Sequence, residues 1–152
     1  MSKRNSVIEV EHIKPDNILI LTEMTLELWP ECYFEKELAS WKNISNDAGS
    51  FCVLAKTSNH YAGFIHVTIR SDYVEGADFE KTAYIEGLYI RPIYRNAGVG
   101  RFLLQQAEKW AILNGIKQIA SDTEIGNLNS QLFHKKAGFE EVNRIVCFLK
   151  DI

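Results

Sequence analysis

Apolar and polar residues alternate along several short segments of the chain, which is the pattern of half-buried β-strands. The segments "SFCVLAK" and "YAGFIHVTIR" flank the polar turn "TSNH", and this arrangement predicts an antiparallel hairpin. Strands are expected over residues 7–13, 50–56, 61–70, 83–90, 117–122 and 144–150.

Apolar residues at spacings of three and four predict helices between these strands. The best-defined helix begins at Val99 and ends at Gly115, a residue type that suits a helix C-terminus. Its apolar stripe comprises Val99, Phe102, Leu103, Ala107, Trp110 and Leu113. Helices are expected over residues 17–29, 35–44, 99–115 and 127–137.

The order of these elements is strand, two helices, three strands, helix, strand, helix, strand. This order predicts an α+β fold with a mixed α/β sheet, in one domain spanning residues 1–152. Residues 83–122 form a strand–loop–helix–strand unit. Its two strands should therefore run parallel, with a right-handed crossover between them.

The composition is that of a globular protein, with 46% hydrophobic and 24% charged residues. A net charge of −3 and a pI near 5.8 lack the basic excess of a nucleic-acid binder, so no such partner is expected. The three cysteines form no CxxC pair, which argues against a zinc site, and Cys52 and Cys147 lie in apolar runs that predict buried free thiols. The N-terminus lacks an apolar signal core and no apolar run has the length of a membrane span, so a cytoplasmic protein is expected.

The sequence "RNAGVG", residues 95–100, joins the expected strand 83–90 to the helix that follows. Glycines let the chain turn sharply and let backbone N–H groups approach a ligand. The start of the helix adds unpaired N–H groups and the positive end of its dipole. Arg95 and Arg101 add positive charge, so the loop predicts a pyrophosphate site.

Two other phosphate-binding loops fit this sequence less well. A P-loop ends in Gly-Lys-Ser/Thr, which is absent here, and a Rossmann loop needs GxGxxG with an acid about 20 residues later. On spacing alone, a tight strand-to-helix turn without a ligand is the alternative.

Glu86 interrupts the apolar strand 83–90. Strict alternation places Tyr84, Glu86, Leu88 and Ile90 on one face and Ala83, Ile85, Gly87 and Tyr89 on the other. Because burying an unpaired carboxylate is costly, Glu86 either forms a salt bridge inside the fold or lines a cleft and meets a cation.

Asp122 ends the next expected strand, at the carboxyl end of the parallel pair. Ligands bind at that edge in open α/β sheets, although an ordinary strand-end aspartate fits as well. Gly87, alone inside its strand, indicates a β-bulge or a close approach of another group to the backbone. A bulge there would splay the parallel strands and open a slot between them.

"RNAGVG" after "LYIRPIY" resembles the R/Q-x-x-G-x-G/A acetyl-CoA loop of the GNAT N-acetyltransferase superfamily, and "NLNSQLFHKKAGF" resembles its second signature. The segments "YIEGLYIRP", "ASDT", "KKAGFEE", "LWP" and "IRSDYVEG" are similar to one branch, the type I aminoglycoside 6′-N-acetyltransferases. The resemblance is dense from residue 61 onward and rests mainly on "LWP" before it. It implies the GNAT fold, a central, mostly antiparallel mixed sheet with a splayed parallel strand pair flanked by helices.

The resemblance implies that acetyl-CoA is the co-substrate and that no metal takes part. The pyrophosphate would bind the loop, and the thioester would lie along the strand with an amide near Leu88 directed at its carbonyl oxygen. Asn127 matches a further cofactor contact, although its position also fits a plain helix N-cap. The implied cofactor-binding residues are Leu88, Tyr89, Ile90, Asn96, Ala97, Gly98, Val99, Gly100, Arg101 and Asn127.

The resemblance also implies that a primary amine of a cationic aminoglycoside attacks the thioester directly in a ternary complex. The implied substrate-binding residues are Trp29, Tyr73, Glu86 and Asp122. Asp122 or Glu86 would be the catalytic base, directly or through water. Another acceptor, such as a polyamine, an antimetabolite or a protein N-terminus, stays open, as does a non-catalytic acetyl-CoA sensor. The intact glycines and both carboxylates favour the enzyme.

Two positions depart from the family pattern. His134 stands where many members have a tyrosine as general acid, and Asn143 stands where the branch often has a glutamate that contacts substrate. Loss of that charge should weaken one amine contact. GNAT sheets commonly end with more strands than the single one that is expected here after helix 127–137. The additional strand would then come from a neighbouring subunit. This predicts a homodimer with sheet contact near residues 140–150.

Overall fold

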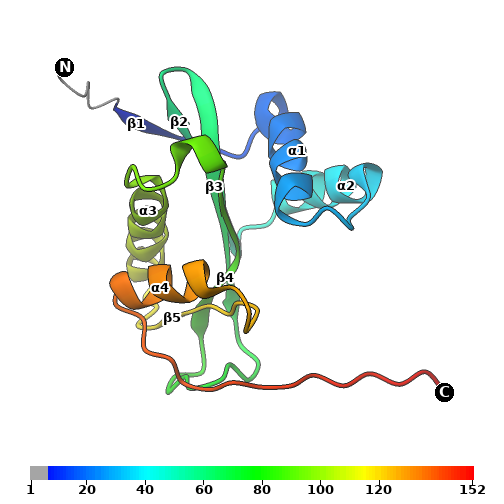
Figure 1. Ribbon diagram of the computed structural model, residues 1–152, viewed down its shortest axis with the longest axis vertical. Coiled ribbons are helices and arrows are strands. Elements are labelled where there is room, and N and C mark those ends of the chain that lie inside the picture. Colours follow the sequence, from blue (N-terminus) through cyan, green and yellow to red (C-terminus); the bar gives the residue numbers. More distant parts are fainter. Residues whose placement is uncertain (1–6) are drawn as a thin grey trace.

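A five-stranded sheet organises residues 7–152, the part of the chain that the computed structural model describes (Figure 1). The strand order is β1-β2-β3-β4-β5, in which the first three pairs are antiparallel and β4 pairs with β5 in parallel. The strands are β1 Ile8–His12, β2 Ser50–Thr57, β3 His60–Arg70, β4 Thr82–Ile90 and β5 Ile119–Ala120. The predicted mixed sheet, the hairpin and the parallel pair are thus confirmed.

Helices cover both faces of this sheet (Figure 1). In Figure 1, α1 and α2 lie on one side, and α3 and α4 lie on the other. The helices are α1 Ile18–Leu28, α2 Phe34–Ile44, α3 Val99–Leu113 and α4 Leu128–Lys136, with short 3-10 turns η1 Pro15–Asn17 and η2 Pro92–Tyr94. All four predicted helices are present, with ends shifted by one or two residues.

Each face of the sheet has its own hydrophobic core. Leu103, Leu104 and Ala107 of α3 pack on one face, because their spacing places them on one side of the helix. Leu21 and Met24 of α1 pack on the other face, against residues such as Phe64 of β3. The sheet is therefore buried on both sides near its centre, and a polar residue in β4 has to find a partner or an opening.

A β-bulge in β4 reverses the facing of its side chains. His66 of β3 pairs with Gly87, but the next residue, Val67, pairs with Ile85, so Glu86 is the extra residue. Ala83, Ile85, Leu88 and Ile90 consequently belong to the α3 core, whereas Tyr89 belongs to the α1 core. The strict alternation predicted for this strand is wrong beyond Ile85. The bulge indicated by Gly87 is confirmed.

The parallel strands separate soon after they meet. β4 and β5 pair only at Ala83↔Ile119 and Tyr84↔Ala120, so β5 is shorter than the predicted strand 117–122. The separation follows the bulge, because the bulged strand bends and its ladder is interrupted there. From Ile85 to Ile90, the edge of β4 that faces away from β3 has no partner strand among the residues that the structure describes.

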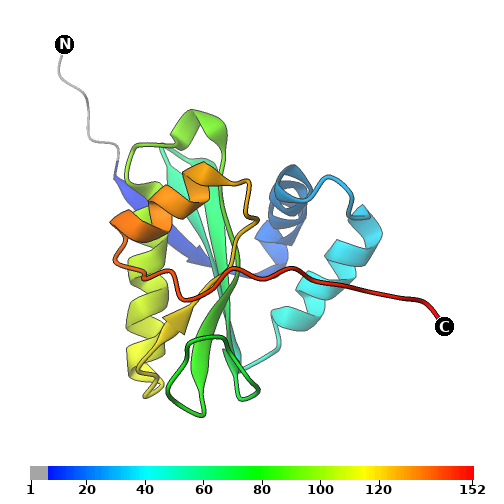
Figure 2. The ribbon, with the colours of Figure 1, turned by 60° about the horizontal axis from the view of Figure 1, so that its bottom comes forward.

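The predicted strand 144–150 is wrong. This segment is extended but pairs with no strand, and it leaves the body of the molecule (Figure 2). Val142 packs on Gly76, and the Asn143 side chain donates to Glu75 Oε1 at 3.2 Å, but the residues beyond them are exposed. A strand forms only where another strand offers its N–H and C=O groups, and within residues 7–152 the segment reaches none.

Of the two cysteines that were expected to be buried, only one is buried. Cys52 is buried as predicted, but Cys147 is exposed because it lies on the extended C-terminal segment. Across residues 7–152, no helix has both the length and the apolarity to cross a membrane. In the same range, no group of three or more His, Cys, Asp and Glu side chains is placed to hold a metal ion.

Candidate active site

The loop between β4 and α3 exposes backbone at the start of a helix. Asn96 and Gly98 both adopt positive φ, 58° and 83°, which turns the chain sharply into α3. Gly98 precedes the helix, and its carbonyl accepts the Phe102 N–H at 2.9 Å. The N–H groups of Val99, Gly100 and Arg101 come before that first helical bond, so they are available to an anion.

Gly100 lies where the loop, α4 and β4 meet. A Cβ at this position would be 3.2 Å from Cε2 of Phe133 and 3.6 Å from Cγ1 of Ile90. The missing side chain therefore lets α4 pack closely against the loop. A larger residue at position 100 would therefore press on Phe133 and move α4 relative to the loop.

The arginines that flank the loop are bound to backbone carbonyls. Arg95 Nε donates to the Ile90 carbonyl at 2.8 Å, and Arg101 Nη1 donates to the Lys136 carbonyl at 3.1 Å. Arg101 thereby joins the start of α3 to the end of α4. Both side chains have structural partners in addition to the charge they bring to the loop.

Asn127 caps α4. Its side-chain oxygen accepts the Ser130 N–H at 3.0 Å, which satisfies one of the unpaired donors of the first turn. The N-cap interpretation of Asn127 is confirmed, and the side-chain amide nitrogen stays available for a second contact.

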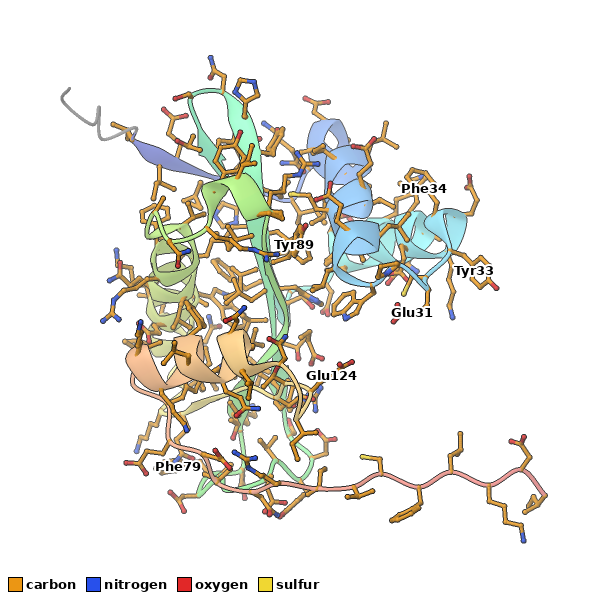
Figure 3. All side chains as sticks on the ribbon, viewed as in Figure 1. Glu31, Tyr33, Phe34, Phe79, Tyr89 and Glu124 are labelled. Carbon is orange, nitrogen blue, oxygen red and sulfur yellow. The ribbon has the colours of Figure 1, made fainter. Side chains whose placement is uncertain are left out.

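Leu88, Tyr89 and Ile90 lie on the part of β4 that has separated from β5. Leu88 and Ile90 direct their side chains to the α3 core, while Tyr89 faces α1 (Figure 3) and its hydroxyl donates to Glu27 at 3.0 Å. Side-chain packing on both faces leaves the open backbone edge between them. An extended ligand could lie along this edge and meet main-chain N–H and C=O groups.

Glu86 forms the centre of a charged cluster on the α1–α2 face of the sheet. Its Oε1 accepts from Thr68 Oγ1 at 2.6 Å and from Arg70 Nε at 3.0 Å, and its Oε2 accepts from Arg70 Nη2 at 2.8 Å. Burial pushes the pKa of Glu86 up, but the hydrogen bonds from Arg70 and Thr68 outweigh it and hold the pKa below its ordinary value. The salt-bridge alternative for Glu86 is thus realised, and the side chain still keeps 28% of its surface exposed.

Asp122 lies beside the same cluster. Burial, followed by the carboxylate of Asp122, raises the pKa of Tyr84 to about 12, so the carboxylate and the Tyr84 hydroxyl are neighbours. The Tyr84 ring in turn stacks under the Arg70 guanidinium, at 3.5 Å from the ring centroid. The structure therefore links the two predicted carboxylates, Glu86 and Asp122, through Arg70 and Tyr84.

Trp29 and Tyr73 differ in where they lie. Trp29 ends α1, and a Cβ on Gly87 would lie 3.0 Å from its Cη2 atom, so the ring rests on the bulge beside Glu86. Tyr73 is 80% exposed on the loop after β3, and its hydroxyl donates to Glu75 at 2.9 Å. The structure places Trp29 at the charged cluster around Glu86, whereas Tyr73 is directed to solvent.

His134 connects α4 with the end of β5. Its Nδ1 donates to the Ser130 carbonyl at 2.7 Å, and its Nε2 lies 2.9 Å from Ser121 Oγ. A carbonyl only accepts, so Nδ1 carries a proton, and in the neutral ring Nε2 therefore accepts from the serine hydroxyl. Both ring nitrogens of a neutral His134 are thus occupied.

Sequence reasoning missed Arg70, Thr68 and His66. Thr68 and Arg70 lie two residues apart on β3, on the face where β4 presents Glu86. Their period of two was available in the sequence, but their register against β4 was not. His66 is buried, and its Nε2 has no hydrogen-bond partner within residues 7–152.

This geometry can be compared with known proteins. The model of the "Acetyltransferase (GNAT) family" matches residues 16–139, more than half of the chain. The chain belongs to the GNAT family. The fold that the resemblance implied is therefore confirmed, and the glycine loop lies at the expected place within it.

Relatives of known function give the branch. "Aminoglycoside N(6')-acetyltransferase type 1" of Salmonella typhimurium is 32% identical over 124 residues, which cover 82% of this chain and 86% of the relative. The protein of the same name from Klebsiella aerogenes is 34% identical over 134 residues, covering 85% and 87%. The resemblance to the aminoglycoside 6′-N-acetyltransferases is thus confirmed.

Solved structures agree with these relatives. AAC(6')-Iy in complex with the bisubstrate analog CoA-S-monomethyl-acetylneamine is similar with a TM-score of 0.92 and 27% identity, covering 97% of this chain and 100% of that one. AAC(6')-Ih from Acinetobacter baumannii is similar with a TM-score of 0.89 and 28% identity, covering 96% and 99%. The similarity includes nearly the whole chain.

Proposed function

We propose that this protein is an aminoglycoside 6′-N-acetyltransferase, which transfers the acetyl group of acetyl-CoA to a primary amine of a cationic aminoglycoside. One observation carries the proposal. A single strand, β4, presents an open backbone edge and a helix-start loop at one end and the carboxylate Glu86 at its bulge, with Asp122 near Tyr84 of the same strand. The two reactants would meet between these features.

The cofactor half fits acetyl-CoA through its backbone. The pyrophosphate would bind the N–H groups from Asn96 to Arg101, in the narrow turn that Gly100 permits. The thioester would lie along the open edge at Leu88–Ile90, where a main-chain N–H can polarise its carbonyl oxygen. Asn127, at the start of α4, would supply its free amide nitrogen.

The acceptor half fits an ammonium group. Glu86 stays ionised because Arg70 and Thr68 stabilise its carboxylate, so it would bind the cation more readily than it would take a proton. Asp122, which is exposed and near the Tyr84 hydroxyl, would accept the proton, directly or through water. The amine nitrogen then bonds to the acetyl carbon, the C–S bond breaks, and CoA leaves as a thiolate that takes a proton from solvent.

Kanamycin acetylation tests this assignment, with thiol release as the readout. Glu86→Ala and Asp122→Ala should each lower kcat/KM by roughly 10²-fold, a loss in the range of general acid–base catalysis, while KM for acetyl-CoA stays close to that of the wild type. Glu80→Ala, which removes an exposed carboxylate elsewhere, is the matched control. If both site variants keep near wild-type kcat/KM, the assignment is wrong. A panel of polyamines and peptides in the same assay would expose a different acceptor.

We also propose that the protein is a cytoplasmic homodimer, joined near residues 140–150. Phe148 and Leu149 are 93% and 97% exposed on an extended segment, and β5 leaves a sheet edge open. Pairing with a second copy would cover the exposed apolar side chains and would supply hydrogen-bond partners to the open strand edge. The need for acetyl-CoA supports the cytoplasm as the compartment.

Light scattering at micromolar concentration tests the dimer. The wild type should have the mass of two chains, and Phe148→Asp with Leu149→Asp should have the mass of one. Ile112→Asp, on the exposed side of α3, is a matched change of an exposed apolar residue and should stay dimeric. A wild-type monomer contradicts the proposal.

A further inference from the structure

Arg70 and Thr68 occupy most of the hydrogen-bond acceptor positions of the Glu86 carboxylate. The guanidinium donates from Nε to Oε1 and from Nη2 to Oε2, at 3.0 and 2.8 Å, and Thr68 donates to Oε1 at 2.6 Å. A carboxylate has about four acceptor positions, and three are occupied here. The remaining position is on Oε2, which receives a single hydrogen bond.

The guanidinium is itself held in place. It stacks on the Tyr84 ring at 3.5 Å, and the planar two-point contact with Glu86 fixes its rotation. The side chains of Arg70 and Glu86 are 33% and 28% exposed, so the pair is partly withdrawn from water. Such charge-assisted, two-point pairs restrain geometry more strongly than a single hydrogen bond does.

The bulge explains why Glu86 needs this restraint. As the extra residue of β4, Glu86 has no residue directly opposite on β3, so no cross-strand neighbour in register with it restrains its carboxylate. Arg70 and Thr68 supply that direction from the neighbouring strand. An unrestrained carboxylate at a bulge could rotate among several rotamers.

We propose that Arg70 is a positioning residue for the acceptor site: it holds the Glu86 carboxylate in one orientation and leaves one acceptor position of Oε2 for the ammonium group of the substrate. This inference rests on the proposed function, because it assigns Glu86 to the acceptor. It also explains why the positively charged Arg70 lies in a site that binds a positively charged amine. A carboxylate held with one open position selects the amine by geometry as well as by charge.

The surroundings of Glu86 define what removal of Arg70 would do. Thr68 and His66 face it from β3, Tyr84 flanks Arg70 from β4, and Asp122 lies beyond Tyr84. Asp72 also acts on Arg70, and Asp47 acts on His66. With Arg70 gone, burial would dominate and would raise the pKa of Glu86. The acceptor site would then lose its charge at a higher pH than in the wild type.

The test compares Arg70→Gln, Arg70→Lys and Thr68→Val with the wild type, using two readouts. The first is the pH profile of kcat/KM for kanamycin, and the second is the carboxyl ¹³C titration of Glu86, assigned with Glu86→Gln. In Arg70→Gln, the acid limb and the Glu86 titration should both move up by roughly one pH unit or more. Arg70→Lys should restore part of the shift, because lysine keeps the charge without the two-point contact. Thr68→Val should give a smaller shift in the same direction.

Controls separate positioning from a loss of structure. KM for acetyl-CoA should stay near the wild-type value in all three variants, and Lys109→Gln, which removes an exposed cation from α3, should change neither readout. In a Glu86→Gln background, Arg70→Gln should move the acid limb no further. An additional shift in that background contradicts the inference.

The two proposals fail in different ways. If Arg70→Gln leaves the Glu86 titration and the acid limb unchanged while Glu86→Gln is inactive, the positioning role is wrong and the proposed function stands. If Glu86→Gln turns over kanamycin normally, Glu86 has no part in the acceptor site and both assignments of Glu86 are wrong. If kanamycin is no substrate but the ¹³C titration shifts, the pair stabilises Glu86 without the proposed function.

Discussion

At one end of the separated part of β4, residues 95–100 present main-chain N–H groups, and the flanking arginines are bound to carbonyls. At the other end, the bulge presents Glu86, whose direction depends on Arg70 and Thr68 of another strand. The cofactor half is thus built from backbone and glycine, and the acceptor half is built from pairs of side chains. Backbone sites depend on local conformation, whereas side-chain sites depend on register between strands.

This difference has a consequence for change by mutation. A backbone site tolerates replacement of its side chains but not the addition of a Cβ where another element packs. A side-chain site is sensitive to single truncations, yet a new set of residues on the same strands can give it a different acceptor. The two halves should therefore respond differently to the substitutions below.

Gly100→Val should have the largest effect. Its Cβ would lie 3.2 Å from Phe133, and its methyl groups would push α4 away from the loop that binds pyrophosphate. We expect affinity for acetyl-CoA to fall by roughly 100-fold, equivalent to about 3 kcal/mol, in isothermal titration. Gly126→Ala is the control, because nothing lies within 4 Å of a Cβ there. Unchanged cofactor affinity in Gly100→Val would show that the loop does not hold acetyl-CoA.

Trp29→Ala should affect the acceptor half alone. The ring rests on Gly87 beside Glu86, so its removal takes away one wall of the proposed acceptor site. KM for kanamycin should rise by about tenfold, as for loss of an aromatic contact worth about 1.4 kcal/mol, and KM for acetyl-CoA should stay unchanged. Trp29→Phe should recover part of the loss. Equal changes in both KM values would indicate a general effect on the fold.

The same contrast decides what the sequence could predict. The helix 99–115, the sharp turn at the glycines before it and the Asn127 cap were predicted correctly because each depends on neighbours within a few residues. The facing of Leu88 and Ile90 was not, since the bulge in β4 shifts its register against the neighbouring strand β3 and reverses it. The Arg70–Glu86 pair also depends on that register. The segment 144–150 has strand-like residues, but a strand needs a partner, and this segment pairs with no strand of residues 7–152.

His134 lies where α4 meets the end of β5, between the proposed cofactor half and the proposed acceptor half. Its replacement shows whether it has a structural role or a catalytic one. Because both ring nitrogens are bonded to Ser130 and Ser121, we expect a structural role. His134→Ala should lower the free energy of unfolding by about 1–2 kcal/mol, or a few degrees in Tm, and lower kcat by less than about threefold. Loss of the basic limb of the kcat profile, with stability unchanged, would instead identify His134 as the acid for the thiolate.

Glu11 offers the smallest effect on activity and the sharpest contrast with Glu86. Both carboxylates accept from a hydroxyl and a cation, but Glu11 lies on β1, where Tyr61 donates at 2.7 Å and Lys56 at 3.0 Å. The hydrogen bond from Tyr61, with help from Lys56, lowers the pKa of Glu11 from 4.5 to about 2. Because its pKa is lowered, the ionised Glu11 stabilises the fold above pH 4.5, and this stabilisation should disappear as the pH falls from 4.5 to about 2.

Glu11→Gln should therefore lower the free energy of unfolding by about 1 kcal/mol at pH 7 and by almost nothing near pH 2. Denaturant unfolding measures this difference, and kcat/KM should stay within about twofold of the wild type. A carboxylate with the same kinds of partners but outside the proposed acceptor site would then affect stability alone. A loss of turnover in Glu11→Gln would contradict this distinction between the two carboxylates.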